Sequence, residues 1–199
     1  MPNAKETGER FREVAGQAVV VRDAVARDIP EVTRIYAHHV LNGLASFEER
    51  APSGEEMLAR YQAIATKGYP YLVAELDGRI VGYAYASAYR PRPAYRFTVE
   101  NSVYVDNAAR GNGIGSALLK TLIDRCEGGI WRQMLAVIGD SANAGSIALH
   151  SRLGFRPAGS LLSVGFKHGR WVDSVIMQRP LAAGDSTLPL TVAPNEDMR

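Results

Sequence analysis

The sequence predicts an α/β fold in which a mixed central β-sheet is flanked by helices on both faces. Between residues 97 and 166, strand-like and helical apolar patterns alternate, as they do where helices cross over between parallel strands. Asp77-Gly78 separates two strand-like runs, and this dipeptide is a strong signal for a tight antiparallel hairpin. The sheet is therefore expected to contain both strand directions, with helices covering its two faces.

The first half of the predicted domain contains three strands and two helices. Asp28 precedes a helical pattern with Pro30 and Glu31 in its first turn, so Asp28 is the expected N-cap. Ser53 and Glu56 have the spacing of a second capping box. The predicted elements are a strand over 18–21, helices that begin near residues 28 and 53, and strands over 71–76 and 79–85.

The second half alternates between strands and helices. Leu118, Leu119 and Leu122 lie on one apolar stripe of a helical pattern. The predicted elements are a strand over 97–106, a helix over 113–126, a strand over 134–138, a helix over 143–153, and closing strands over 155–166 and 171–177.

The predicted domain spans residues 18–182. A chain of 199 residues suits one domain. Residues 1–17 are charged and weakly patterned, and residues 183–199 contain Pro189 and Pro194 without periodicity. We therefore expect a flexible N-terminal extension over 1–17 and a flexible C-terminal tail over 183–199.

The composition argues against several classes of protein. Apolar residues make up 46% and charged residues 22%, as in an ordinary globular domain. The net charge of +2 gives no reason to expect a nucleic-acid partner. No apolar run approaches the roughly 18 residues of a membrane span. The single cysteine, Cys126, excludes an intrachain disulfide, and no histidine has a partner at metal-ligand spacing. We expect a cytoplasmic protein that binds no metal.

A glycine-rich turn lies between the strand over 97–106 and the helix over 113–126. It consists of Arg110, Gly111, Asn112, Gly113, Ile114, Gly115 and Ser116. Glycines let the backbone approach a ligand closely, and free amides at the start of a helix favour an anion. The Arg110 guanidinium adds a bidentate partner for phosphate oxygens. The turn is predicted to bind a diphosphate, and a glycine-rich connection without a ligand is the alternative.

The spacing of the glycines distinguishes between kinds of diphosphate site. A Walker loop requires a lysine after the glycines, and a Rossmann turn spaces its glycines differently. The run instead resembles the Arg/Gln-x-x-Gly-x-Gly/Ala signature of the GCN5-related N-acetyltransferase (GNAT) superfamily. The segments 143–146 and 153–155 resemble a second motif of that superfamily. The resemblance covers about residues 19–181 and implies the GNAT fold.

This resemblance implies acetyl-CoA as the co-substrate. In the superfamily the turn binds the pyrophosphate, and the equivalent of Asn143 touches the pantetheine arm. Ser146, in the same segment, is a further expected co-substrate-binding residue. The strand that precedes the turn is expected to carry a bulge. The free amides of this bulge, near Val103, Tyr104 and Val105, would then meet the pantetheine and the thioester carbonyl.

Candidate acceptor-binding residues precede the turn. Glu100, Ser102 and Tyr104 alternate along one strand, so an unbulged strand places them on one face. A carboxylate near the thioester takes a proton from the amine, which makes Glu100 the expected general base. A strand-edge glutamate is the alternative. A basic loop containing Arg90 and Arg92 suits an anionic acceptor, and a solvated loop is the alternative.

Several segments resemble the phosphinothricin acetyltransferases, a group that includes acetyltransferases of methionine sulfone and methionine sulfoximine. The segments are 95–105, 136–139, His150 and the run from Gly165 to Asp173. The resemblance implies that Glu100 and His150 form the catalytic pair, with His150 or water protonating the leaving thiolate. A packed histidine is the alternative. It further implies a homodimer, and an acceptor pocket that includes Phe47, Arg90, Arg92, Tyr95, Ser102 and Tyr104.

The predicted activity is transfer of an acetyl group from acetyl-CoA to the amino group of a small amino acid or analogue, by direct attack in a ternary complex. The first alternative is the same chemistry on a polyamine, an aminoglycoside or a peptide N-terminus, although Arg90 and Arg92 would repel polycations. The others are a module that binds acyl-CoA without turnover and a nucleotide-binding regulatory domain. The presence of Glu100 and His150 disfavours the former, and the absence of a Walker lysine disfavours the latter.

Overall fold

The computed structural model describes residues 10–14 and 17–189, which fold around one β-sheet. The strands are β1 (Arg10–Val14), β2 (Gln17–Asp23), β3 (Tyr71–Leu76), β4 (Arg79–Ala88), β5 (Thr98–Val105), β6 (Gln133–Gly139), β7 (Arg156–Lys167) and β8 (Arg170–Pro180). The helices are α1 (Ile29–Asn42), α2 (Gly54–Ala65), α3 (Ile114–Glu127) and α4 (Ala144–Arg152). Short 3-10 helices occupy Ala26–Asp28, Pro93–Tyr95 and Asn107–Ala109.

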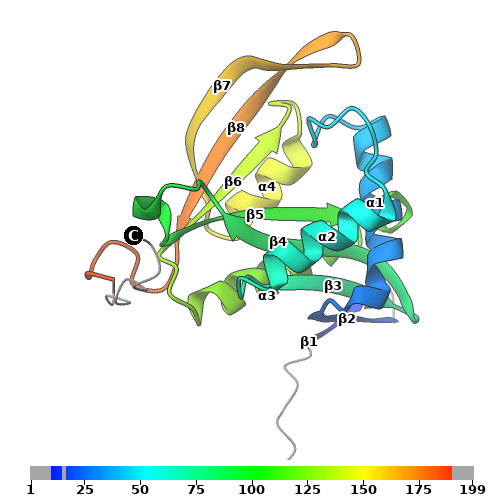
Figure 1. Ribbon diagram of the computed structural model, residues 1–199, viewed down its shortest axis with the longest axis horizontal. Helices are drawn as coiled ribbons and strands as arrows, with labels where there is room; N and C mark the ends of the chain where they lie inside the picture. Colours follow the sequence, from blue (N-terminus) through cyan, green and yellow to red (C-terminus); the bar gives the residue numbers. More distant parts are fainter. Residues whose placement is uncertain (1–9, 15–16, 190–199) are drawn as a thin grey trace, which may run out of the picture.

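The sheet is mixed, as predicted. The strand order is β1-β2-β3-β4-β5-β6-β8-β7, and β5 and β6 form the parallel pair among otherwise antiparallel neighbours of the described chain. Asp77 and Gly78 turn β3 into β4 with φ values of 50° and 74°. Figure 1 shows β7 and β8 as a long hairpin that extends beyond the other strands. The predicted strands and helices are all present, with ends shifted by a few residues.

Helices cover both faces of the sheet, which confirms the predicted layers. Alternate residues of β3 enter two separate core clusters, Leu72 the cluster that contains α3 and Val73 the cluster that contains α1 and α2. Because successive side chains of a strand point to opposite faces, the two clusters lie on opposite sides of the sheet. Leu118 of α3 and Val32 of α1 are fully buried in their respective clusters.

Two local predictions differ from the structure. Asp28 does not cap α1 with its side chain. Its carboxylate accepts hydrogen bonds from the Arg22 guanidinium at 2.7 and 3.0 Å and from the Val25 amide at 2.9 Å, because these donors compete successfully with the helix amides. Residues 10–14, expected in a flexible extension, form β1 along the free edge of β2. Backbone pairing does not require apolar side chains, and charged residues are common on edge strands. The rest of residues 1–16 lies outside the described residues.

The described residues form neither a membrane-spanning helix nor a metal-binding cluster. None of their helices is long and apolar enough to cross a membrane. None of their histidine, cysteine, aspartate and glutamate side chains gather in groups of three or more that would suit a metal ion.

Candidate active site

The parallel strands β5 and β6 separate in the middle of the sheet. Their register pairs run from Thr98 with Gln133 to Asn101 with Ala136. β5 continues to Val105 beyond the last pair, so the side of β5 that faces β6 is open there. Backbone amides on that side are available to a ligand.

The direction of each amide on β5 follows from its pairing with β4. The Asp106 amide donates to Val81 O at 2.8 Å, and alternate residues of a strand point their amides to the same side. The Tyr104 amide therefore faces β4, whereas the amides of Val103 and Val105 face the opening. The register from Val99 to Val105 has no shift, so the implied bulge is not present in β5.

The glycine-rich turn has the shape that its sequence predicts. After the 3-10 helix Asn107–Ala109, Gly111 and Gly113 adopt φ values of 81° and 73°. These left-handed conformations favour glycine. Gly113 is the N-cap residue of α3, and it makes no side-chain cap because it has no side chain. The first amides of α3 therefore remain available to an anion at the end of the turn.

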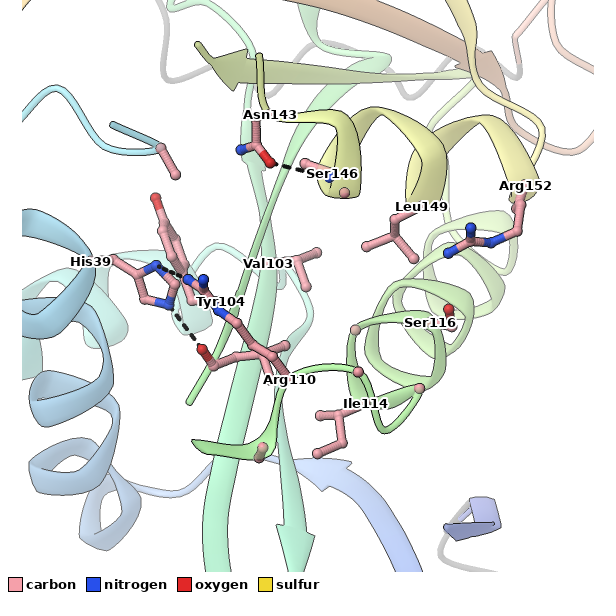
Figure 2. A pocket seen from close by; sticks show the side chains of 17 residues that line it. His39, Val103, Tyr104, Arg110, Ile114, Ser116, Asn143, Ser146, Leu149 and Arg152 are labelled. Carbon is pink, nitrogen blue, oxygen red and sulfur yellow. Dashed lines mark hydrogen bonds between the residues drawn. The ribbon is translucent and has the colours of Figure 1, made fainter. Parts of the chain in front are cut away.

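A cavity of about 480 Å³ lies between α1, β5, α3 and α4 (Figure 2). Every residue that we predicted to bind the co-substrate lines it except Asn112. The lining residues that the sequence analysis missed are His39, Ala45, Ala109, Gly145, Leu149 and Arg152. Gly145 and Leu149 lie on the helix that begins at the second superfamily motif, so helical spacing was a usable signal for them. His39 and Ala45 carried no such signal.

His39 holds two groups at the cavity wall (Figure 2). Its Nε2 lies 2.9 Å from Val105 O, and the Arg110 guanidinium lies 3.5 Å from its Nδ1. Nε2 therefore donates to the carbonyl and Nδ1 accepts from Arg110, which requires a neutral ring. Burial lowers the pKa of His39, and the nearby Arg110 charge acts in the same direction. The ring is thus kept in the form that positions Arg110.

His150 is buried, and both of its ring nitrogens are engaged. Nδ1 lies 2.8 Å from Ser146 O, and Nε2 lies 3.0 Å from Asn101 Oδ1. Asn101 is oriented by a hydrogen bond from its Nδ2 to Leu135 O at 2.9 Å. His150 also lines a cavity of about 60 Å³ that adjoins the larger one along the opening. It therefore ties α4 to β5 at the inner end of the site.

Glu100 and His150 lie on opposite faces of β5. Glu100 precedes Asn101, so its side chain points away from the face on which Asn101 contacts His150. Glu100, Ser102 and Tyr104 share the face covered by α1 and α2, as the alternation predicts. The two candidate catalytic residues thus approach a substrate from different sides of the open strand.

The Glu100 carboxylate is half-buried. No other group of the described residues forms a hydrogen bond or ion pair with it. Burial raises its pKa above the ordinary value of 4.5. An unpaired carboxylate in such surroundings is a typical general base.

The predicted acceptor residues do not form one closed pocket. Arg90 and Arg92 are exposed in the β4–β5 connection, where Arg90 stacks on the Tyr89 ring at 5.1 Å. Tyr95 packs edge-on against Tyr89. Phe47 lies elsewhere, against Gly165 of β7. The acceptor side is therefore open, and its predicted residues come separately from the β4–β5 connection and from the α1–α2 connection.

A family model described as the acetyltransferase (GNAT) family matches residues 34–155. The chain belongs to this family. The match runs from within α1 to just beyond α4, and it includes the glycine-rich turn and every residue that lines the larger cavity. The superfamily resemblance stated from the motifs is confirmed, and so is the fold that it implied.

Named relatives of this GNAT chain cover most of its length. The phosphinothricin N-acetyltransferase of Alcaligenes faecalis is 58% identical over 89% of this chain and 90% of its own. The L-methionine sulfoximine/L-methionine sulfone acetyltransferase of Pseudomonas paraeruginosa is 42% identical over 79% of this chain and 92% of its own. A phosphinothricin acetyltransferase from Sinorhizobium meliloti, solved in complex with acetyl-CoA, has a TM-score of 0.86 at 50% identity. The matched region covers 90% of this chain and 97% of the Sinorhizobium meliloti chain.

The two buried histidines make the stability of this acetyltransferase depend on pH. Burial lowers the pKa of His39 and of His150 below 6.5, and unfolding restores that value. Just below pH 6.5 the unfolded chain therefore binds more protons than the folded chain does. The free energy of unfolding is highest above this pH and falls as pH decreases. Urea unfolding at about pH 7.5 and about pH 5.5 measures this difference. His150→Gln is expected to reduce the difference in unfolding free energy between the two pH values. The control His168→Asn replaces an exposed histidine and is expected to leave this difference unchanged. Equal wild-type stability at both pH values contradicts the prediction.

Proposed function

We propose that this GNAT acetyltransferase transfers the acetyl group of acetyl-CoA to the amino group of a small amino acid or analogue of the phosphinothricin, methionine sulfone or methionine sulfoximine type. The observation that carries the proposal lies on β5, where open amides border the cavity and the unpaired Glu100 carboxylate lies on the adjoining face. Relatives named for these acceptors support the acceptor class. A cytoplasmic location is supported by the free, buried thiol of Cys126.

The cavity has the chemistry that acetyl-CoA requires. The turn 110–116 would bind the pyrophosphate through its amides, the start of α3 and the Arg110 guanidinium. The Val105 amide would bind the pantetheine arm in the manner of an added strand, and the Val103 amide would face the thioester carbonyl. Asn143 Oδ1 accepts from the Ser146 amide at 3.2 Å, which fixes the Asn143 side chain at the cavity wall. Bound here, acetyl-CoA supplies an activated acyl group.

Residues of β5 and α4 would perform the proton transfers. Glu100 accepts a proton from the protonated amine, and the neutral nitrogen then bonds to the thioester carbon while the carbon–sulfur bond breaks. The Val103 amide donates to the carbonyl oxygen as negative charge develops there. The nitrogen loses its second proton to water, the leaving thiolate gains one from His150 or water, and a His150 that has donated its proton recovers one from water. Coenzyme A leaves as the thiol, and Glu100 returns its proton to solvent.

The acceptor would meet positive charge and aromatic surface. None of the described carboxylates pairs with Arg90 or Arg92, so both guanidinium groups remain available to an anionic acceptor. Phe47, Tyr95, Ser102 and Tyr104 supply the remaining walls in this proposal. Such a site favours a zwitterionic amino acid over a polycation, because a polycation would approach two unpaired arginines.

A thiol-release assay tests the proposed function. Wild-type protein with acetyl-CoA is expected to release coenzyme A with methionine sulfone, methionine sulfoximine or phosphinothricin. Spermidine, an aminoglycoside and a peptide serve as comparison acceptors. Release with spermidine and none with the amino acids would overturn the acceptor class. Tight binding of acetyl-CoA without release for any amine would show a binding module instead.

We further propose that a second copy of the chain covers the β7–β8 hairpin. β7 is the last strand of the described sheet, and Leu162, Phe166 and Trp171 of the hairpin are more than half exposed. Exposed apolar side chains beside an open strand edge suit a twofold contact between identical chains. Light scattering is expected to show a dimer for wild type and for Leu41→Lys on α1, and a monomer for Leu162→Lys combined with Trp171→Lys. A monomeric wild type contradicts this proposal.

A further inference from the structure

The run from Gly165 to Asp173 resembles a motif of the phosphinothricin acetyltransferase group, yet none of its residues lines either cavity of the site. The structure shows what it contacts instead. His168 and Gly169 form the hairpin turn with φ values of 50° and 74°. On one side of the hairpin, Asp173 Oδ2 accepts from Ser141 Oγ at 2.6 Å, in the loop that leads into α4. On the other side, the run contacts the α1–α2 connection.

Lys167 makes the most unusual of these contacts. Lys167 is only 3% exposed. Its Nζ donates a hydrogen bond to Ser46 O at 2.7 Å, although the two residues are 121 positions apart in the sequence. Burying an ammonium group is unfavourable unless polar partners compensate for lost water. Burial lowers the pKa of Lys167, and the nearby Glu49 and Glu48 carboxylates partly offset this effect by favouring the charged form. Lys167 therefore forms a charge-assisted hydrogen bond with the loop backbone.

Gly165 supports the same loop from the same face of β7. Residues 165 and 167 are two apart on a strand, so both face the α1–α2 connection. A Cβ on Gly165 would lie 2.5 Å from Phe47 Cε2, so the absence of a side chain leaves the space that the Phe47 ring occupies. The hairpin thus contacts both Ser46 and the residue after it.

Lys167 holds the loop of residues 43–53, and this loop forms part of the wall of both cavities of the site. Ala45 lines both cavities. Ser46 Oγ lies 2.9 Å from Tyr36 OH, and the Tyr36 ring packs edge-on against Tyr104 of β5. A shift of the Ser46 backbone would therefore move Phe47 and the surroundings of Tyr104 together. Figure 1 shows this connection at the same end of the molecule as the tip of the β7–β8 hairpin.

We propose that Lys167 is a positioning residue for the acceptor: through the Ser46 carbonyl it fixes loop 43–53, and thereby sets the affinity for the amino-acid acceptor without touching it. The inference rests on the proposed function for the identity of the acceptor. The role of Lys167 in fixing the position of loop 43–53 does not depend on the proposed function. Lys167 itself lines neither cavity, and loop 43–53 reaches the acetyl-CoA cavity only through Ala45, so co-substrate binding is expected to depend on Lys167 less than acceptor binding does.

The test compares Lys167→Met with Lys167→Arg and with the matched control Lys120→Met, whose side chain is 58% exposed on α3. Methionine keeps the length and loses the donor. We expect Lys167→Met to raise the KM for the acceptor by roughly tenfold or more, the effect of losing a hydrogen bond to a charged group. The kcat is expected to stay near wild type, and the KM for acetyl-CoA is expected to change by less than the KM for the acceptor. Lys167→Arg keeps a cationic donor, so its KM for the acceptor is expected to lie between those of wild type and Lys167→Met.

Hydrogen exchange separates loop position from acceptor identity. Amides of residues 43–53 are expected to exchange faster in Lys167→Met, while those of β3 and α3 stay protected. Unchanged exchange in 43–53 overturns the proposal, and so does faster exchange with an unchanged acceptor KM. If wild type acetylates none of the amino acids, the proposed function and the acceptor role fail together, and the exchange result still decides whether Lys167 positions the loop.

Discussion

Replacing Glu100 with glutamine is expected to reduce kcat by about 10²- to 10⁴-fold, the usual contribution of a general base. Glutamine keeps the size and polarity of the side chain but cannot accept the proton of the amine. Since Glu100 lines neither cavity of the co-substrate site, the dissociation constant for acetyl-CoA is expected to stay near wild type. Thiol release measures the first quantity, and calorimetric titration measures the second.

The pH profile gives this substitution a second readout. Burial raises the pKa of Glu100 above 4.5, so the wild-type rate is expected to fall when acid protonates this carboxylate. In Glu100→Gln this acid limb disappears. The deficit of the variant is expected to shrink at alkaline pH, because more of the acceptor amine is already neutral there.

Glu55→Gln is the matched control, since Glu55 is an exposed glutamate on α2. It is expected to have the wild-type rate at every pH. An unchanged rate for Glu100→Gln near neutral pH would remove Glu100 from the mechanism, and a parallel loss of acetyl-CoA affinity would indicate a structural role instead.

Features determined by neighbouring residues were predictable from the sequence. The Asp77-Gly78 turn has the positive φ values that its composition favours. The Ser53 hydroxyl accepts from the Glu56 amide at 3.1 Å, as the cap spacing predicts. The glycines before α3 adopt left-handed conformations for the same local reason. In each case the physical cause lies within a few residues of the chain, so a sequence pattern contains it.

Contacts between distant segments were not predictable in the same way. Asp28 has the residue type and spacing of an N-cap, yet the Arg22 guanidinium binds its carboxylate. These two residues are only six positions apart, so here the fold of the β2–α1 connection, rather than a distant segment, overrides the cap pattern. His39 is buried on α1 together with other residues at helical spacing. Its bond to Val105, 66 positions away, places it at the cavity. Lys167 and Ser46 are related only by the folded hairpin.

The relation of Glu100 to His150 shows a further limit. The resemblance paired them, but it does not state on which side of β5 each lies. The unshifted register of β5 with β4 fixes this geometry, because it keeps the alternation of side chains intact past Asn101. In the proposed mechanism the pair therefore acts from opposite faces of an open strand. His150 must then release its contact to Asn101 or Ser146 in order to donate a proton elsewhere.

Gly113→Val is expected to weaken acetyl-CoA binding by roughly 10- to 100-fold. Gly113 has a φ of 73°, a conformation that costs a β-branched residue about 1–3 kcal/mol. The variant relaxes by moving the turn, and binding the pyrophosphate requires the turn to return to the strained conformation. The strain is therefore subtracted from the binding free energy, at about 1.4 kcal/mol for each factor of ten. Calorimetric titration of acetyl-CoA measures the change.

Gly78→Val separates this effect from a general loss of stability. Gly78 has a φ of 74° and no atom within 4 Å of an added Cβ, and it lies in the β3–β4 turn outside the cavity. The strain on the backbone is thus nearly the same in the two variants, and both are expected to unfold at lower temperature by similar amounts. Only Gly113→Val is expected to lose affinity for acetyl-CoA. Wild-type affinity in both variants would mean that the turn before α3 does not bind the pyrophosphate, whereas equal losses of affinity in both would attribute the effect to folding.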